Sequence, residues 1–143
     1  MSEERTLVEG TARGRALVLD EPLSFWGGVD PATGDVIDVR HPQYGANVAG
    51  RVLVMPSGRG SSSSSSVLAE SVRAGTAPAA IVLLEPDPIL ALGAIVAREL
   101  YGLTIPIVVS TTRPRVRDGD LVSVRATGRR AEILADSTSR DGT

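Results

Sequence analysis

The chain has 143 residues and carries 15 basic against 17 acidic side chains, for a formal net charge of −2. That length predicts one domain, and 42% hydrophobic with 22% charged residues is typical of a globular protein. No stretch reaches the roughly 18 consecutive apolar residues of a membrane span, so we expect no membrane partner. The arginines are scattered and aromatic residues are few, which disfavours a nucleic-acid partner. Residues 1–5 lack the apolar segment of a signal peptide, and we expect a cytoplasmic location.

Cysteine is absent and His41 is the single histidine. This composition excludes disulfides, thiol catalysis and thiolate ligation of zinc or of an iron–sulfur cluster by the chain itself. With one histidine, a Ser-His-Asp triad or a multi-histidine metal site is also disfavoured. Any chemistry at this chain is therefore sparse or is shared with a partner.

The apolar pattern predicts alternating strands and helices. In the first part of the chain we expect one bulged strand or two short ones over 6–19, a loop over 20–34 and a short strand over 35–39. A strand over 51–55 follows, then a helix through Val67, Leu68 and Val72 that ends at Gly75, and a strand over 79–84. The last part is a helix over 89–101 that ends at Gly102, a strand over 105–110, and a hairpin of 121–126 with 131–135 around Gly128.

Strand and helix alternate from 51 to 110, which implies parallel strands joined by right-handed crossovers. The flanking β segments then complete a mixed sheet or barrel with two to three helices. We expect a single compact α/β domain over residues 1–135, followed by a disordered polar tail over 136–143.

Six consecutive serines, Ser61 to Ser66, follow the strand at 51–55 through a Gly-Arg-Gly turn. Composition alone suggests a flexible linker. The position, directly before a helical pattern, also fits a plain serine N-cap. A third interpretation is an anion-binding helix terminus, because glycines allow close approach and the first amides of a helix are unpaired. The Lys-Ser/Thr ending of a phosphate-binding P-loop is missing, which disfavours nucleotide binding.

Several motifs resemble the small, swivel-domain subunit of aconitase X. They are SFWGGVDP at 24–31, His41-Pro42, PSGRGSSS at 56–63 and APAAI at 77–81, and the resemblance extends from about Gly10 to Ala135. FWGGVDP and GRGSSS are its specific parts. The resemblance implies a swivelling β/β/α-type domain and a two-subunit hydro-lyase, such as cis-3-hydroxy-L-proline dehydratase or mevalonate 5-phosphate dehydratase.

The resemblance also implies roles for the partner and for individual residues. A cysteine-bearing large subunit is expected to hold iron or an iron–sulfur cluster, with no cofactor on this chain. Ser61 corresponds to the serine base of aconitases, and we expect Gly60, Ser62 and Ser63 to contact the small hydroxy-acid substrate. Ordinary aconitases have a substrate-binding arginine where this chain has Ser63, and no motif makes Arg59 its replacement.

Three further sites carry open alternatives. Phe25 and Trp26, beside Gly27-Gly28, are either core residues or anchors for the large subunit, because aromatics are common in both settings. His41 is a possible acid or base, but it has no titratable partner by spacing, and a structural or surface role is favoured. Glu85 and Asp87 follow a buried strand, where ligands often bind, although a turn and helix cap at Asp87 is the favoured interpretation. The leading hypothesis is a small hydro-lyase subunit, and the alternative is a non-catalytic anion-binding module.

Overall fold

A computed structural model describes residues 4–59, 62–112 and 114–136. Its strands are β1 (Glu4–Val8), β2 (Gly10–Val18), β3 (Val52–Met55), β4 (Ala80–Leu83), β5 (Ile107–Ser110), β6 (Leu121–Thr127) and β7 (Arg130–Asp136). Its helices are α1 (Phe25–Gly28), α2 (Ser64–Ala74) and α3 (Pro88–Tyr101). No helix in these ranges is long and apolar enough to cross a membrane.

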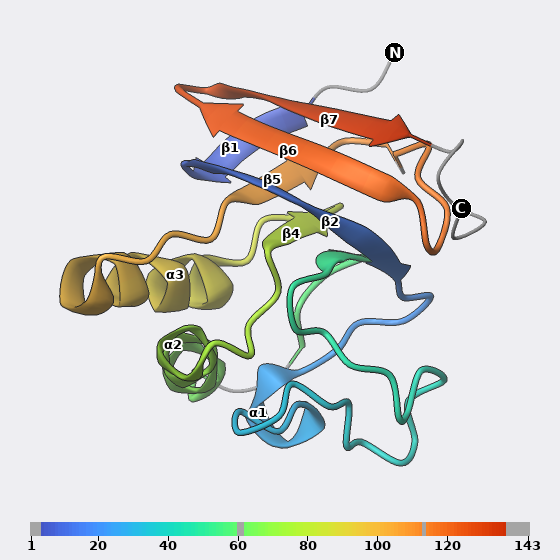
Figure 1. The fold of residues 1–143 in the computed structure, drawn as a ribbon, viewed down its shortest axis with the longest axis vertical. Coiled ribbons are helices and arrows are strands. Elements are labelled where there is room, and N and C mark those ends of the chain that lie inside the picture. The colour runs from blue at the N-terminus through green and yellow to red at the C-terminus, as the bar shows by residue number, and fades with distance from the viewer. Residues whose placement is uncertain (1–3, 60–61, 113, 137–143) are drawn as a thin grey trace.

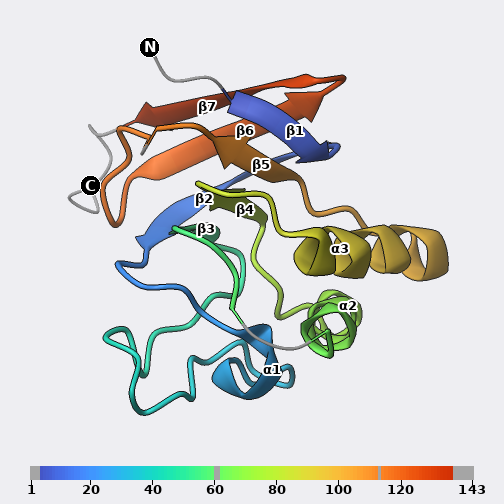
Figure 2. The same ribbon diagram turned by 180° about the vertical axis from the view of Figure 1, so that it is seen from behind.

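The strands close into a mixed barrel in the order β1-β5-β4-β3-β2-β6-β7, and pairing of Arg5 with Arg130 joins the two ends. Strands β2, β3, β4 and β5 are parallel neighbours, whereas β1 and the β6–β7 hairpin pair antiparallel. Helices α2 and α3 lie side by side on one side of the barrel, and the loop that contains α1 lies beside α2 (Figures 1 and 2). This confirms the predicted fold class.

Strand β3 shows why the central strands read as continuous apolar runs. Val52 and Val54 point into the barrel, whose interior is filled by valine and alanine. Leu53 and Met55 point the other way, into the larger core beneath the helices. All four are buried, because a parallel strand in this position has protein on both faces.

The structure corrects one local prediction and extends another. Residues 35–39 form only isolated bridges, Val29 with Val36 and Asp35 with Asn47, because Gly34 turns the chain at a φ of 84° and no strand lies alongside for continuous pairing. Helix α2 passes through Val67, Leu68 and Val72 and ends before Gly75 as predicted, and it begins at Ser64, so the serine run supplies its first turn. Of the predicted tail, Asp136 is the last residue of β7, and 137–143 lie outside the described residues.

Candidate functional site

An open cleft of about 240 Å³ lies where β3 and β4 end and α2 and α3 begin. Its walls include Ser57 to Arg59 after β3, Ser64 at the start of α2, and Glu85 and Asp87 after β4. In open α/β sheets this edge, outside the carboxyl ends of parallel strands, is where ligands usually bind. Both helices point their positive N-terminal ends toward the same edge.

Hydrogen bonds to Ser64 attach the SFWGGVDP segment, residues 24–31, to the start of α2. The Trp26 amide donates a hydrogen bond to Ser64 Oγ (3.1 Å), and Ser24 Oγ donates one to the Trp26 carbonyl (2.9 Å). Since the Ser24 proton is used there, the 3.4 Å contact between the two hydroxyls has Ser64 as its donor. The three bonds form a closed ring, which fixes the orientation of the buried Ser64 hydroxyl away from solvent.

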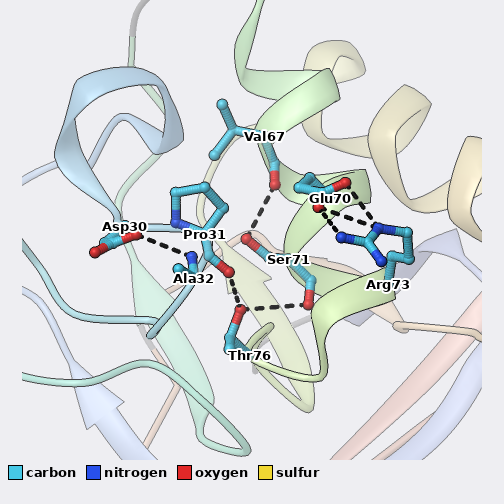
Figure 3. A network of polar contacts seen from close by, with 8 residues as sticks. All are labelled: Asp30, Pro31, Ala32, Val67, Glu70, Ser71, Arg73 and Thr76. Carbon is cyan, nitrogen blue, oxygen red and sulfur yellow. Dashed lines mark hydrogen bonds and ion pairs between the residues drawn. The ribbon is translucent and has the colours of Figure 1, made fainter.

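The other end of the same segment is attached to the end of α2. Thr76 Oγ1 donates to the Pro31 carbonyl (2.6 Å) and approaches the Ser71 carbonyl (3.4 Å), as Figure 3 shows. Ser71 Oγ in turn donates to the Val67 carbonyl one helical turn earlier (2.9 Å). The FWGGVDP segment is therefore fixed at both ends of α2, although 38 and 45 residues separate the partners in sequence.

An exposed ion pair between Glu70 and Arg73 lies on α2 beside this network (Figure 3). The hydrogen bond from Arg73 lowers the pKa of the Glu70 carboxyl, and the same bond raises the pKa of the Arg73 guanidinium. Both groups are open to solvent, so the pair lies on the surface of α2 and is not part of the cleft.

Asp87 caps α3, as the sequence pattern favoured. Its Oδ1 accepts from the amides of Ile89 (2.9 Å) and Leu90 (3.2 Å). The second oxygen lies over Gly58, where an added Cβ would stand 1.9 Å from Asp87 Oδ2. Gly58 is therefore required for the carboxylate to reach across from β4 to the chain that leaves β3.

The serine run divides into two parts. Ser64 to Ser66 belong to α2, which excludes a flexible linker for those residues. Ser62 and Ser63 form the turn before the helix: the Ser62 carbonyl accepts from the Ser65 amide (3.2 Å) and the Ser63 carbonyl from the Val67 amide (3.2 Å). Ser63 occupies the N-cap position, but its side chain makes no capping hydrogen bond because its backbone is already helical (φ −65°, ψ −15°).

Gly60 and Ser61 lie outside the described residues, between Arg59 on the cleft wall and the exposed Ser62. The roles expected for them, and for Ser62 and Ser63 as substrate contacts, remain predictions. The cleft does unite residues from three segments that the sequence analysis singled out separately: Gly58 and Arg59 after β3, Ser64 of the serine run, and the Glu85–Asp87 loop.

The two aromatics beside Gly27-Gly28 have different environments. Phe25 is fully buried in the core under the helices, so its predicted interface role is corrected: no surface of its ring is left for a partner. Trp26 is 58% exposed, at a backbone position that is not helical (φ −78°, ψ 112°). Of the pair, only Trp26 remains a candidate interface residue.

His41 is buried and holds two backbone segments together. Its Nδ1 accepts from the Gln43 amide (3.0 Å), so Nε2 carries the proton and donates to the Glu21 carbonyl (3.2 Å). Both ring nitrogens are used, and the ring is not among the residues that line the cleft. This confirms the structural role that was favoured from sequence.

Neither end of the Ser24–Ser64 contact was recognised from sequence, because nothing local links two serines 40 residues apart. In the part of the chain that the structure describes, no group of three or more His, Asp or Glu side chains is placed to hold a metal ion. The cleft thus offers hydroxyls, amides and a few charges, and these suit substrate binding and proton transfer rather than metal ligation.

Comparison with known proteins decides the family. A sequence model of the aconitase X swivel domain matches residues 1–133. The chain belongs to the aconitase X swivel-domain family. Its fold matches a crystal structure of Thermococcus kodakaraensis aconitase X in its holo-form, with a TM-score of 0.81 and 37% identity over 93% of this chain and 97% of that one.

Two relatives bear on the reaction. The chain is 58% identical over 103 residues to a cis-3-hydroxy-L-proline dehydratase of Pseudomonas aeruginosa, a match that covers 72% of this chain but only 18% of that protein. It is 37% identical over 139 residues to a phosphomevalonate dehydratase small subunit of Methanosarcina acetivorans, covering 95% of this chain and 92% of the relative. Both relatives are named as dehydratases, so the family is one of lyases.

Proposed function

We propose that the chain is the swivel subunit of a two-chain aconitase X-type hydro-lyase that dehydrates a small hydroxy acid such as cis-3-hydroxy-L-proline. One observation carries the proposal: in a member of this family, the chain from Ser57 to Arg59 after β3 and Ser64 at the start of α2 line the same cleft. The 58% identity to a protein named for this substrate supports the choice of hydroxy acid.

The chemistry assigns Ser61 a defined task. Dehydration of a β-hydroxy acid breaks the Cα–H bond and the Cβ–OH bond, and the two electrons of the C–H bond form the new C=C bond. Ser61, as its alkoxide, accepts the proton and becomes a neutral hydroxyl, while the substrate hydroxyl leaves with the C–O bonding electrons as hydroxide and takes up a proton from solvent to form water. A serine hydroxyl is a weak base, so it needs activation by its surroundings. Amides at a helix N-terminus favour negative charge by only ~0.3–1 kcal/mol when exposed, and a dry cleft closed by a partner is therefore required.

The metal of the reaction is assigned to the partner. This chain lacks cysteine, and its described residues contain no cluster of possible metal ligands. The residues present on this chain therefore do not fit an iron or iron–sulfur site. We propose that a cysteine-bearing large subunit holds it and closes the cleft.

Trp26 is the proposed anchor for that subunit. Its ring is 58% exposed, while its backbone is held at the cleft by Ser64. Exposed tryptophans fixed on a rigid backbone are enriched among residues that dominate interface energies. We propose that a partner that contacts Trp26 binds beside the cleft, because the Trp26 amide is bonded to Ser64 on the cleft wall.

Mevalonate 5-phosphate is the second candidate substrate. Small subunits named for phosphomevalonate dehydration match with up to 50% identity over 93 residues, as in Methanothermobacter thermautotrophicus. A dehydration assay of the purified two-subunit complex on both substrates separates the candidates. Turnover of the phosphorylated substrate alone would support the alternative, and turnover of neither would favour a non-catalytic binding module.

Ser61→Ala tests the proton acceptor. Positioned acid–base groups contribute typically 10²–10⁴-fold, so we expect kcat to fall by roughly that factor in the assembled complex. Ser66→Ala is the matched control, because Ser66 belongs to the same run but is exposed on α2. Full activity of Ser61→Ala in a properly assembled complex would overturn the assignment.

A further inference from the structure

Two opposite charges line the cleft without neutralising each other. Arg59 follows β3 and Glu85 follows β4, and both side chains are exposed on the wall. Neither forms an ion pair or hydrogen bond with any residue in the described ranges, and the ion pairs Glu70–Arg73 and Arg98–Glu99 lie on α2 and α3. The Arg59 guanidinium and the Glu85 carboxylate are therefore both available to bind a ligand that carries a negative and a positive group.

The third charged group of the cleft is already engaged. Asp87 uses one oxygen on the first amides of α3, which places its charge on the positive end of that helix. Arg59 and Glu85 are therefore the charges left for recognition. The cleft, at about 240 Å³, is smaller than the ~300–1,000 Å³ of pockets for drug-sized ligands and suits a molecule with few heavy atoms.

We propose that Arg59 and Glu85 select a zwitterionic hydroxy amino acid: the arginine binds its carboxylate and Glu85 binds its ammonium group. This inference rests on the proposed function and names the substrate class of the same cleft. A guanidinium matches the planar geometry of a carboxylate, which makes Arg59 the natural anion partner. Arg59 would also supply a cation near the position where this chain has Ser63 and ordinary aconitases have an arginine, although no motif links the two positions.

The same charges disfavour the phosphorylated substrate. A phosphate monoester carries about −1.5 to −2 at neutral pH, and mevalonate 5-phosphate adds a carboxylate without any cation. Its binding would leave Glu85 unpaired beside a polyanion, with one arginine on the wall to oppose three negative groups. Like charges brought together at a binding site are unfavourable and give discrimination against the wrong ligand.

Unreactive ligands test the inference independently of turnover. We would measure by calorimetry the affinity of the assembled two-subunit complex for L-proline, for (S)-tetrahydrofuran-2-carboxylate, which replaces the ammonium by an ether oxygen, and for L-prolinamide, which lacks the carboxylate. Hydrogen bonds to charged groups lead us to expect L-proline to bind at least about tenfold tighter than either analogue. Glu85→Gln should abolish the preference over the ether, and Arg59→Gln the preference over the amide.

Glu132→Gln and Arg125→Gln are matched controls, because both residues are exposed on the β6–β7 hairpin, across the barrel from α1 and α2 (Figures 1 and 2). They should keep both preferences. Equal binding of all three ligands, no binding of L-proline, or unchanged preferences in the two cleft variants would overturn the inference. If the preferences follow Glu85 and Arg59 but cis-3-hydroxy-L-proline is not dehydrated, the inference stands and the proposed reaction fails. If cis-3-hydroxy-L-proline is dehydrated but L-proline is not preferred over the ether analogue, the proposed reaction stands and the inference fails.

Discussion

Replacing Gly58 by alanine should destabilise the protein by disturbing a helix cap 29 residues away. The new Cβ would lie 1.9 Å from Asp87 Oδ2 and 3.1 Å from its Cγ, so the carboxylate has to leave its position. Its departure removes the two capping bonds to Ile89 and Leu90. Loss of an N-cap costs ~0.5–2 kcal/mol. We therefore expect the free energy of unfolding to fall by about 1–2 kcal/mol and the Tm by roughly 3–8 °C.

A double-mutant cycle measured by chemical denaturation isolates this cause. Asp87→Ala alone should cost about as much as Gly58→Ala, because both remove the same cap. In the Asp87→Ala background the clashing oxygen is gone, and Gly58→Ala should then cost less than about 0.5 kcal/mol, the usual error of additivity. Additive losses in the double variant would refute the reasoning, because they would show that Gly58 acts on the fold by another route.

Three further perturbations follow from contacts in the structure. Gly93→Ala should destabilise the protein by ~1–3 kcal/mol in urea denaturation, because the new Cβ would meet the Ser65 carbonyl oxygen at 2.7 Å. Helix propensity alone predicts a gain of about 1 kcal/mol, so the sign of the change in unfolding free energy shows which effect is larger. Trp26→Ala should change stability by less than ~1 kcal/mol but weaken binding to the large subunit by ~2 kcal/mol or more in calorimetry, and equal losses of both would contradict the interface role. Titration by NMR should show Glu70 ionising below its ordinary pKa of 4.5, and Arg73→Gln should return it there. Because that pKa is lowered in the folded state, the pair's contribution to stability is present above pH 4.5 and is lost as the pH falls through the folded pKa.

Much of the barrel was predictable because its signals are local. Continuous apolar runs such as those of β3 and β4 occur where a strand is buried on both faces, and the alternation of strand and helix between them implies parallel pairing. Gly75 and Gly102 end α2 and α3 at φ values of 77° and 68°, a backbone conformation in which glycine is strongly favoured. These features require no knowledge of distant neighbours.

The candidate site was only partly predictable, because its geometry depends on long-range contacts. The serine run was singled out, but the sequence left a linker, a cap and an anion site open. The bond from the Trp26 amide to Ser64 shows why the run begins a helix against the FWGGVDP segment. The burial of Phe25 and the exposure of Trp26 likewise depend on how the segment packs against the core, which two adjacent aromatic residues do not reveal in the sequence.

The sequence by itself determined the family, the order of the central strands and helices, and the absence of thiol ligands from the chain. The family follows from the resemblance of motifs such as FWGGVDP and GRGSSS, whereas periodicity and residue type are sufficient for the other two, because each is expressed within a few neighbouring residues. Only the tertiary structure decided that the ends of β3 and β4 bring Arg59, Glu85 and Asp87 to one cleft. Residues about 26 positions apart can meet there because parallel pairing aligns the carboxyl ends of successive strands, and the relative placement of charges on different strands is not encoded in any local pattern.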